Sequence, residues 1–207
     1  MSTEEEAGKA VVSLPNSRVS LANSTTAMGS VQPSADARTG EPLDGAWQLD
    51  PRASSVEFRT RHLWGLQTVK GRFDSYHGKL DLSATPAVEL TIDAASVQTG
   101  NGKRDRHLRS ADFFDVENHS RMKFVSDSVE LRGETLRVRG RLTVRGRSIP
   151  LELDAEVRRV GGELKLNAAA MAPHRELGIT WSPLRMIRPH SKLAVTAHLI
   201  QHVDHAA

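Results

Sequence analysis

The sequence contains no cysteine, few aromatic residues and no long apolar run. Without cysteine the chain can form no disulfide and perform no thiol chemistry. It holds only five Phe, three Trp and one Tyr, and no exposed aromatic platform for stacking nucleic-acid bases is apparent. No stretch approaches the roughly 20 apolar residues of a membrane-spanning helix. We therefore expect no nucleic-acid partner and no transmembrane segment.

The first 44 residues differ in composition from the rest. They are rich in Ser, Ala, Thr, Pro and Gly and contain no aromatic residue, so they cannot bury enough surface to offset the entropy of ordering. Acidic residues at positions 4–6 take the place of the basic start of a signal peptide, and no apolar region follows. We predict a disordered tail (1–44), a folded domain (45–201) and a C-terminal tail (202–207), in a cytoplasmic protein.

The segment 136–147 is the clearest strand in the sequence. Apolar or glycine residues occupy one parity and polar residues the other, and strand side chains alternate between faces. The dry face then carries Leu136, Val138, Leu142 and Val144, and the wet face carries Arg137, Arg139, Arg141, Arg145 and Arg147. Gly140 and Gly146 add no side chain to the dry face, which predicts a curved sheet with interior room.

Similar alternation recurs along the chain and predicts an all-β fold. Turn residues separate the runs, and no long helical pattern intervenes, which favours an antiparallel meander closing into a barrel or sandwich. The predicted strands are residues 47–50, 55–62, 69–73, 78–82, 88–93, 122–126, 129–131, 136–147, 149–157, 164–168 and 192–200.

Charge is divided unevenly between tail and domain. The tail carries six acidic and three basic residues, a net −3, and the whole chain is +3, so the domain is about +6. A basic domain can serve as an interaction module for an acidic partner. The simpler interpretation is a solvated outer face, because arginines that alternate with core residues must point towards water.

Residues 99–115 interrupt the strand pattern and predict a short helical crossover. Asn101 and Ser110 are suitable N-caps, and Phe113 and Phe114 can anchor the crossover to the barrel mouth. The spaced motifs around this segment resemble the YceI-like family of polyisoprenoid-binding proteins. They are Arg104-Asp105-x-His107-Leu108-Arg109-Ser110, Asp112-Phe113-Phe114-Asp115, Phe124-x-Ser126, Gly140-x-Leu142-Thr143-x-x-Gly146 and Arg175-x-x-Gly178-Ile179, with Asp50-Pro51 and Gly71-x-Phe73 upstream. Ala53, Ser120 and His174 depart from the usual family residues.

The resemblance implies a lipocalin-like antiparallel β-barrel of about eight strands with short helical crossovers. It also implies that the interior holds one long-chain isoprenoid lipid or quinone-like molecule. Small inward residues and few aromatics leave space for such a ligand. The expected cavity residues are Phe58, Leu90, Ile92, Phe113, Phe114, Val138, Gly140, Leu142, Leu153 and Val195.

Polar residues of the crossover and beyond have two interpretations. Arg104, His107, Arg109 and Arg175 can donate hydrogen bonds to a lipid head group at the barrel mouth, or they can pair with Asp105, Asp112 and Asp115 as a structural network. The same aspartates, with His107, can be considered as acid–base pairs, but no nucleophile or oxyanion signature accompanies them. Trp47, Trp64 and Trp181 can cap the cavity or close the barrel ends.

We predict non-catalytic binding, carriage or sequestration of an isoprenoid lipid, with no catalytic residue, no cofactor and no metal. The nine histidines form no recognised ligand pattern. The alternatives are an enzyme acting on a bound lipid and a basic interaction module. Transient membrane contact and a homodimer stay open.

Overall fold

The computed structural model describes residues 43–62, 66–180 and 189–201. All of them belong to the second of two units into which the chain divides, residues 39–207. The predicted tails, 1–44 and 202–207, therefore lie almost wholly outside the described residues.

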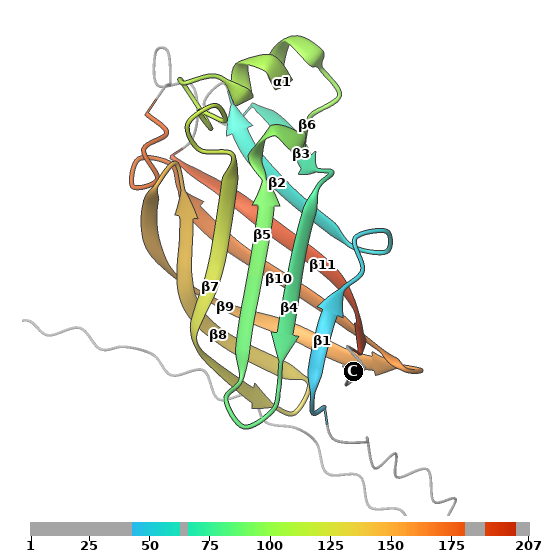
Figure 1. The fold of residues 1–207 in the computed structure, drawn as a ribbon. Helices are drawn as coiled ribbons and strands as arrows, with labels where there is room; N and C mark the ends of the chain where they lie inside the picture. Colours follow the sequence, from blue (N-terminus) through green and yellow to red (C-terminus); the bar gives the residue numbers. More distant parts are fainter. Residues whose placement is uncertain (1–42, 63–65, 181–188, 202–207) are drawn as a thin grey trace, which may run out of the picture. The chain divides into compact units, whose positions relative to one another are not determined.

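Strands make up most of the described fold (Figure 1). A 3-10 turn (Ala94–Ser96) and one α-helix, α1 (Gly102–Arg109), interrupt them. The strands are β1 (Ala46–Leu49), β2 (Ser55–His62), β3 (Gln67–Phe73), β4 (Tyr76–Asp81), β5 (Ala87–Asp93), β6 (Val97–Gln98), β7 (Arg121–Arg132), β8 (Thr135–Val144), β9 (Arg147–Val160), β10 (Glu163–Pro173) and β11 (His190–Gln201).

Eight strands close into a ring in the order β1-β4-β5-β7-β8-β9-β10-β11, and β11 pairs back to β1. Every pairing in the ring is antiparallel. The first half of β11 pairs instead with β2, which continues to β3 and β6. Closure leaves the ring without an unpaired edge. The predicted lipocalin-like barrel of about eight strands with a short helical crossover is thus confirmed.

The arginine-rich strand alternates as predicted up to Val144. On β8, Leu136, Val138 and Val144 are buried towards the interior. The predicted strand is wrong at its end, because Arg145 and Gly146 form the turn between β8 and β9. Both have positive φ angles, 52° and 69°, which is the geometry of a two-residue hairpin turn that matches the twist of its strands. Gly146 therefore shapes a turn, as predicted from its place between two strands, and adds nothing to an inward face.

Two predicted strands are joined into one. Residues 122–126 and 129–131 were expected to be separated by a turn, but β7 runs through both. The register against β8 shifts between Ser126 and Ser128, which identifies a β-bulge. A bulge absorbs the additional residue and increases the local bend without ending the strand.

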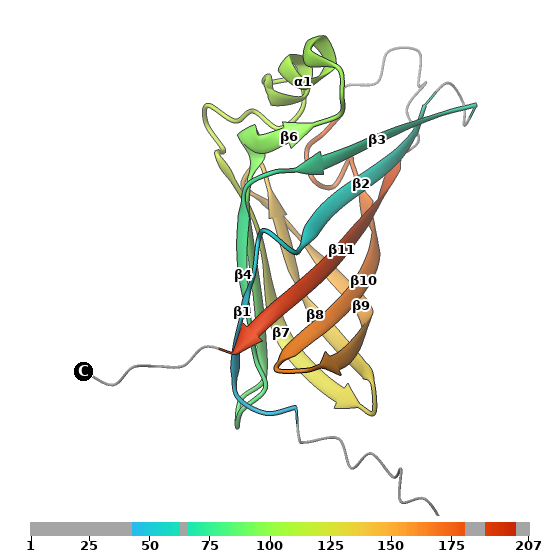
Figure 2. The ribbon, with the colours of Figure 1, turned by 90° about the vertical axis from the view of Figure 1, so that its right-hand side faces the viewer.

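The crossover lies at the upper end of the barrel, above β6 and β3 (Figure 2). Asn101 caps α1 as predicted, because its side-chain oxygen accepts from the backbone N–H groups of Lys103 and Arg104. The second predicted cap is wrong. Ser110 is the C-cap of α1, and its hydroxyl donates to the carbonyl of His107 rather than starting another helix.

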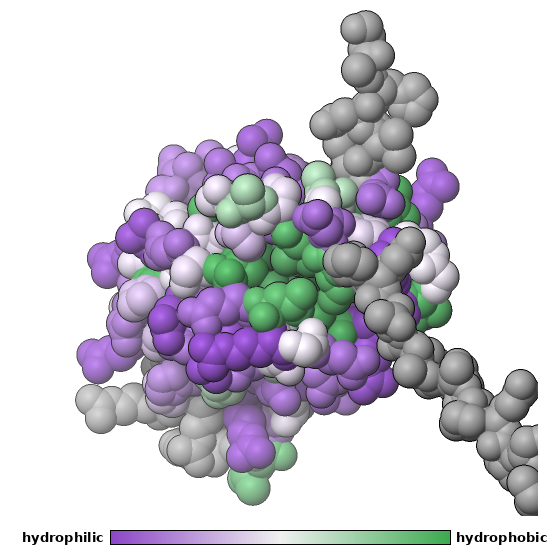
Figure 3. All heavy atoms as spheres, turned by 90° about the horizontal axis from the view of Figure 1, so that it is seen from below, coloured by the Kyte–Doolittle hydropathy of each residue, from purple (hydrophilic) through white to green (hydrophobic). Residues whose placement is uncertain are grey.

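Large buried side chains fill the lower end of the barrel, opposite α1. Trp47, Leu136, Val157 and Leu164 are at most 1% exposed. Leu131, Val160 and Ile200 lie near the ends of β7, β9 and β11 and are partly exposed. Figure 3 views this end, where apolar surface lies in the middle of a hydrophilic border. In the described part of the chain, no helix has the length and apolar character needed to cross a bilayer.

Candidate functional site

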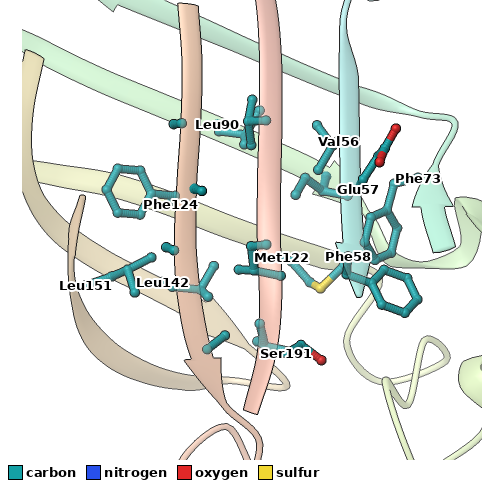
Figure 4. A pocket seen from close by; sticks show the side chains of 18 of the residues that line it. Val56, Glu57, Phe58, Phe73, Leu90, Met122, Phe124, Leu142, Leu151 and Ser191 are labelled. Atoms are coloured by element: carbon teal, nitrogen blue, oxygen red, sulfur yellow. The ribbon is translucent and has the colours of Figure 1, made fainter. Parts of the chain in front are cut away.

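An apolar cavity of about 840 Å³ occupies the barrel above the filled lower end. Side chains from the strands of the ring, from β2 and β3 and from the crossover line it. Figure 4 shows apolar side chains such as Leu142 and Met122 in its wall. The volume lies towards the upper end of the range of about 300–1,000 Å³ that is usual for sites binding small molecules. The barrel interior is thus not completely filled by side chains.

Nine of the ten residues expected in the cavity line it. They are Phe58, Leu90, Ile92, Phe113, Phe114, Val138, Leu142, Leu153 and Val195. Strand parity locates most of them, because a residue two positions from an inward residue also faces inward. Their contact with a ligand stays a prediction.

Gly140 is the tenth residue, and it is not part of the lining. A Cβ atom at this position would overlap the carbonyl oxygen of Val125 and come within 2.8 Å of the Phe124 ring. The glycine therefore allows β7 to approach β8 closely at the bulge, and its missing side chain creates no room for a ligand.

Two features keep the cavity open and shaped. Alanines at alternate positions of β10, Ala168, Ala170 and Ala172, project little into the interior. At the upper end the rings of Phe58 and Phe73 lie 5.7 Å apart, and those of Phe73 and Phe114 lie 5.9 Å apart. This series of aromatic contacts attaches the crossover to the barrel wall, as predicted for Phe114.

The crossover is held by a polar network around Thr99. Asp105, which is 4% exposed, accepts from the backbone N–H of Thr99 at 3.0 Å and from its hydroxyl at 2.5 Å. Arg104 donates from Nε to the Thr99 hydroxyl at 2.8 Å and from Nη2 to the Thr99 carbonyl at 2.9 Å. Arg104 also lines the cavity, so it braces the helix at the cavity edge.

The other head-group candidates occupy different positions. His107 lines the cavity and lies 3.1 Å from an Asp112 carboxylate oxygen. Arg109 is outside the lining and donates to the carbonyls of Ala95 and Val97 at 2.7 and 2.8 Å. Arg175 is exposed and also outside the lining. The structure thus brings two of the four, Arg104 and His107, to the cavity.

Sequence reasoning missed ten polar residues of the lining, which are Glu57, Thr60, Gln67, Lys79, Glu89, Asn101, Lys103, Arg106, His174 and Ser191. Lys103 and Arg106 lie three positions apart on α1, a spacing that places them on neighbouring parts of one helix face. Thr60, His174 and Ser191 form a group in the barrel wall. Parity could have located two of these, because Thr60 continues the inward series of Val56 and Phe58, and Ser191 that of Leu193 and Val195.

His174, Ser191 and Thr60 are joined by hydrogen bonds. Nε2 of His174 lies 2.7 Å from Oγ of Ser191, and the same hydroxyl contacts the hydroxyl of Thr60. Ser191 is 8% exposed. Burial lowers the pKa of His174 to about 4, and the electrostatic interaction with His190 acts in the same direction. The imidazole is therefore uncharged at neutral pH.

The remaining candidates show no catalytic or metal-binding arrangement. Within the described ranges, no three His, Asp or Glu side chains lie close enough together to share a metal ion. Asp105 and His107 have separate partners, Thr99 and Asp112. Trp47 lies in the filled lower end, whereas Trp64 and Trp181 lie outside the described residues.

Three of the five arginines of the wet face are paired with acidic residues. Arg137 forms an ion pair with Asp154 at 3.0 Å, Arg139 with Glu152 at 3.3 Å and Arg141 with Asp127 at 2.8 Å. Hydrogen bonding to Asp154 raises the pKa of Arg137, and the same bond lowers the pKa of Asp154. The acidic partners reduce the positive field of this face.

Known proteins share both the sequence and the fold. A UPF0312 protein of Serratia proteamaculans is 36% identical over 124 residues, 57% of this chain and 64% of that protein. Protein YceI of Salmonella arizonae is 32% identical over 125 residues, 58% of this chain and 65% of that protein. The matched region thus spans slightly less than two thirds of these relatives.

Solved structures show the same barrel. BcnA of Burkholderia cenocepacia has a TM-score of 0.67 at 16% identity, covering 72% of this chain and 98% of that chain. A domain of Saccharophagus degradans, described as polyisoprenoid-binding, has a TM-score of 0.65 at 17% identity, covering 75% and 98%.

The family model of the YceI-like domain matches residues 47–199, from the buried Trp47 of β1 to the buried Leu199 of β11. That range includes most or all of each strand of the ring, the crossover and every residue of the cavity wall. The chain belongs to the YceI-like family.

Proposed function

We propose that the protein binds a long-chain isoprenoid lipid or a quinone-like molecule inside the barrel and carries or sequesters it without catalysis. The observation that supports this proposal most strongly is the apolar cavity of about 840 Å³ in a closed barrel. The polyisoprenoid-binding description of the Saccharophagus degradans domain, which shares the fold, agrees with it.

The energetics favour a long apolar chain. Each methylene transferred from water to the cavity contributes about 0.8 kcal/mol, whereas association costs about 4–15 kcal/mol in lost freedom and ordering. A ligand with several isoprene units therefore gains enough to bind tightly. A short amphiphile gains much less, so chain length should dominate affinity.

Arg104 and His107 are the proposed contacts of a head group that reaches the crossover, because both line the cavity there. Arg109 and Arg175 are not retained in this role, since they lie outside the lining. We also propose, from the sequence, that the protein is cytoplasmic. The exposed apolar residues at the lower end, Leu131, Val160 and Ile200, support transient membrane contact. A homodimer stays a prediction.

The two alternatives have less support. A basic interaction module needs arginines that converge on a free patch, but Arg137, Arg139 and Arg141 are paired with acids along a strand. An enzyme needs a competent base in the cavity. Of the two histidines in the lining, His174, whose pKa is lowered to about 4, is a weak base at neutral pH, and His107 is held by Asp112 in the crossover.

The test is to purify the full chain without detergent, record its native mass spectrum and extract its lipids. We expect one apolar isoprenoid per chain, displaced by added long-chain isoprenoids but not by a five-carbon analogue. A spectrum of ligand-free protein that also fails to take up any added isoprenoid would contradict the proposal.

A further inference from the structure

Thr60, Ser191 and His174 form a polar group in a cavity wall that is otherwise mainly apolar. Ser191 and Asp105 are the two polar residues of the described ranges that are less than a tenth exposed, and Asp105 already accepts hydrogen bonds from Thr99. Thr60 and Ser191 are register partners on β2 and β11, 131 positions apart in the sequence. Figure 4 shows Ser191 among the apolar side chains of the cavity. A buried polar group in such a place requires an explanation.

The three side chains have one more proton to donate than they use between themselves. A threonine hydroxyl, a serine hydroxyl and a neutral imidazole each carry one such proton. The two links, Thr60 to Ser191 and Ser191 to His174, use two of them. If Nε2 of His174 is the acceptor, the remaining proton is on His174 Nδ1; if Nε2 is the donor, it is on the hydroxyl of Thr60 or of Ser191. The group can therefore donate a hydrogen bond to an oxygen atom.

The charge of the group limits what that oxygen can be. No member is ionised at neutral pH, so nothing within the group compensates an anion that has lost its water. The lysines and arginines of the lining lie elsewhere: Lys103 and Arg106 of α1 are exposed to solvent, and Arg104 already donates to Thr99. Lys79 of β4 is exposed as well and forms an ion pair with Glu89 at 3.6 Å. A phosphate would gain little at the hydroxyl pair. An uncharged carbonyl, hydroxyl or ether oxygen loses much less on entering the cavity.

We infer that Thr60, Ser191 and His174 are a hydrogen-bonding site for an uncharged oxygen of the ligand, of the kind carried by a quinone or an isoprenoid alcohol. The inference rests on the proposed function and specifies the chemistry of the bound head group. The group selects such lipids over hydrocarbons of the same length and over isoprenoid phosphates.

The test measures the affinity of four probes for the full chain by displacement of N-phenyl-1-naphthylamine fluorescence. The probes are a benzoquinone with a two-isoprene tail, geranylgeraniol, geranylgeranyl diphosphate and the hydrocarbon phytane. The variants are Ser191→Ala and Thr60→Val. Ser148→Ala is the matched control, because Thr143 and Ser148 form a hydroxyl pair across β8 and β9 at 2.7 Å, outside the cavity.

We expect each cavity variant to bind the quinone or the alcohol about 3- to 10-fold more weakly, the effect of one hydrogen bond. Phytane should bind as before or more tightly, and the control should change nothing. The alcohol should bind the parent more tightly than the diphosphate does. Ser191→Thr, which keeps the hydroxyl, should retain the parent's preference for the quinone and the alcohol over phytane. If Ser191→Ala does not fold, Thr60→Val is compared with Ser191→Thr.

Three results would overturn the inference. An equal loss for phytane would mean that the variants alter the shape of the cavity. Unchanged affinity of the cavity variants for both the quinone and the alcohol would mean that the group does not contact the ligand. Hydrolysis of a nitrophenyl ester that depends on Ser191 would identify a nucleophile instead.

If the parent binds none of the probes, phytane included, the proposed function itself fails. A larger loss of affinity for the quinone than for the alcohol would indicate that the bound oxygen is a quinone carbonyl. A larger loss for the alcohol would indicate that it is a hydroxyl.

Discussion

Trp47 of β1 and Gln201 of β11 are register partners, and this pairing closes the barrel between its first and last strands. The indole of Trp47 is 1% exposed and lies beneath the cavity rather than in its wall. Its Nε1 donates to the carbonyl of Asp44 at 3.2 Å, and the guanidinium of Arg159 lies 5.6 Å from the ring centre. One side chain thus links the closure of the ring to the filling of its lower end.

Replacing Trp47 with Ala should therefore destabilise the domain strongly. The substitution removes a large buried side chain and leaves a void beneath the cavity, which costs about 3–5 kcal/mol of the free energy of unfolding. Trp47→Phe should cost clearly less, because it retains most of the packing. Urea denaturation of the three proteins measures both values, and equal stability of parent and Trp47→Ala would show that the lower end is not held by this residue.

Removing residues 1–42 should leave the domain folded. The segment precedes Leu43, which packs against the hydrophobic core, and its composition offers little surface to bury. We expect the same cooperative thermal transition and the same lipid uptake as in the full chain. Loss of the cooperative transition in the truncated protein would show that the segment contributes to the fold.

The arginines of the wet face should contribute little to stability. Exposed ion pairs gain little in water, so we expect Arg137→Gln, Arg139→Gln and Arg141→Gln each to shift the melting temperature by less than about 2 °C. Binding of an acidic polymer such as heparin is measured in parallel at several salt concentrations. Tight, steeply salt-dependent binding that disappears in the triple variant would favour the basic interaction module.

His174 should make stability depend on pH. Its pKa is about 4 in the folded protein, against an ordinary value of 6.5, so protonation favours the unfolded chain. Its contribution is complete above about pH 6.5 and is lost as the pH falls through about 4. Relative to His174→Gln, the parent should lose roughly 1–3 kcal/mol of unfolding free energy between pH 7 and pH 4. Parallel pH profiles of the two proteins would mean that His174 is not buried as a neutral imidazole.

Most of the fold could be predicted because alternation is a local signal. On β8 the inward positions Leu136, Val138, Leu142 and Val144 follow directly from parity. The same signal cannot distinguish a bulge from a turn. At residues 126–128 the chain forms a bulge and continues as a strand because it stays paired with β8, and that pairing is not a local property of the sequence. It also extended β8 through Arg145, since only a positive φ angle reveals the hairpin turn.

The candidate site was predicted in part for related reasons. Parity placed apolar residues such as Val138 and Val195 in the cavity wall. Gly140 was placed there because a missing side chain suggests space, but the backbone of Val125 and the ring of Phe124 occupy that space. The group of Thr60 and Ser191 depends on the pairing of β2 with β11, which no local pattern specifies.

The most direct test of the account compares two Ala→Phe substitutions in the upper part of the barrel. Ala170 lines the cavity, whereas Ala194, on the neighbouring strand and of opposite parity, does not. Lipid uptake is measured by native mass spectrometry after exposure to a long-chain isoprenoid, with thermal unfolding as the control for folding. We predict that Ala170→Phe folds, because the cavity has space for the ring, and takes up little or no lipid, while Ala194→Phe binds as the parent does. A folded Ala170→Phe protein with unchanged uptake would contradict the proposal that the ligand occupies this cavity.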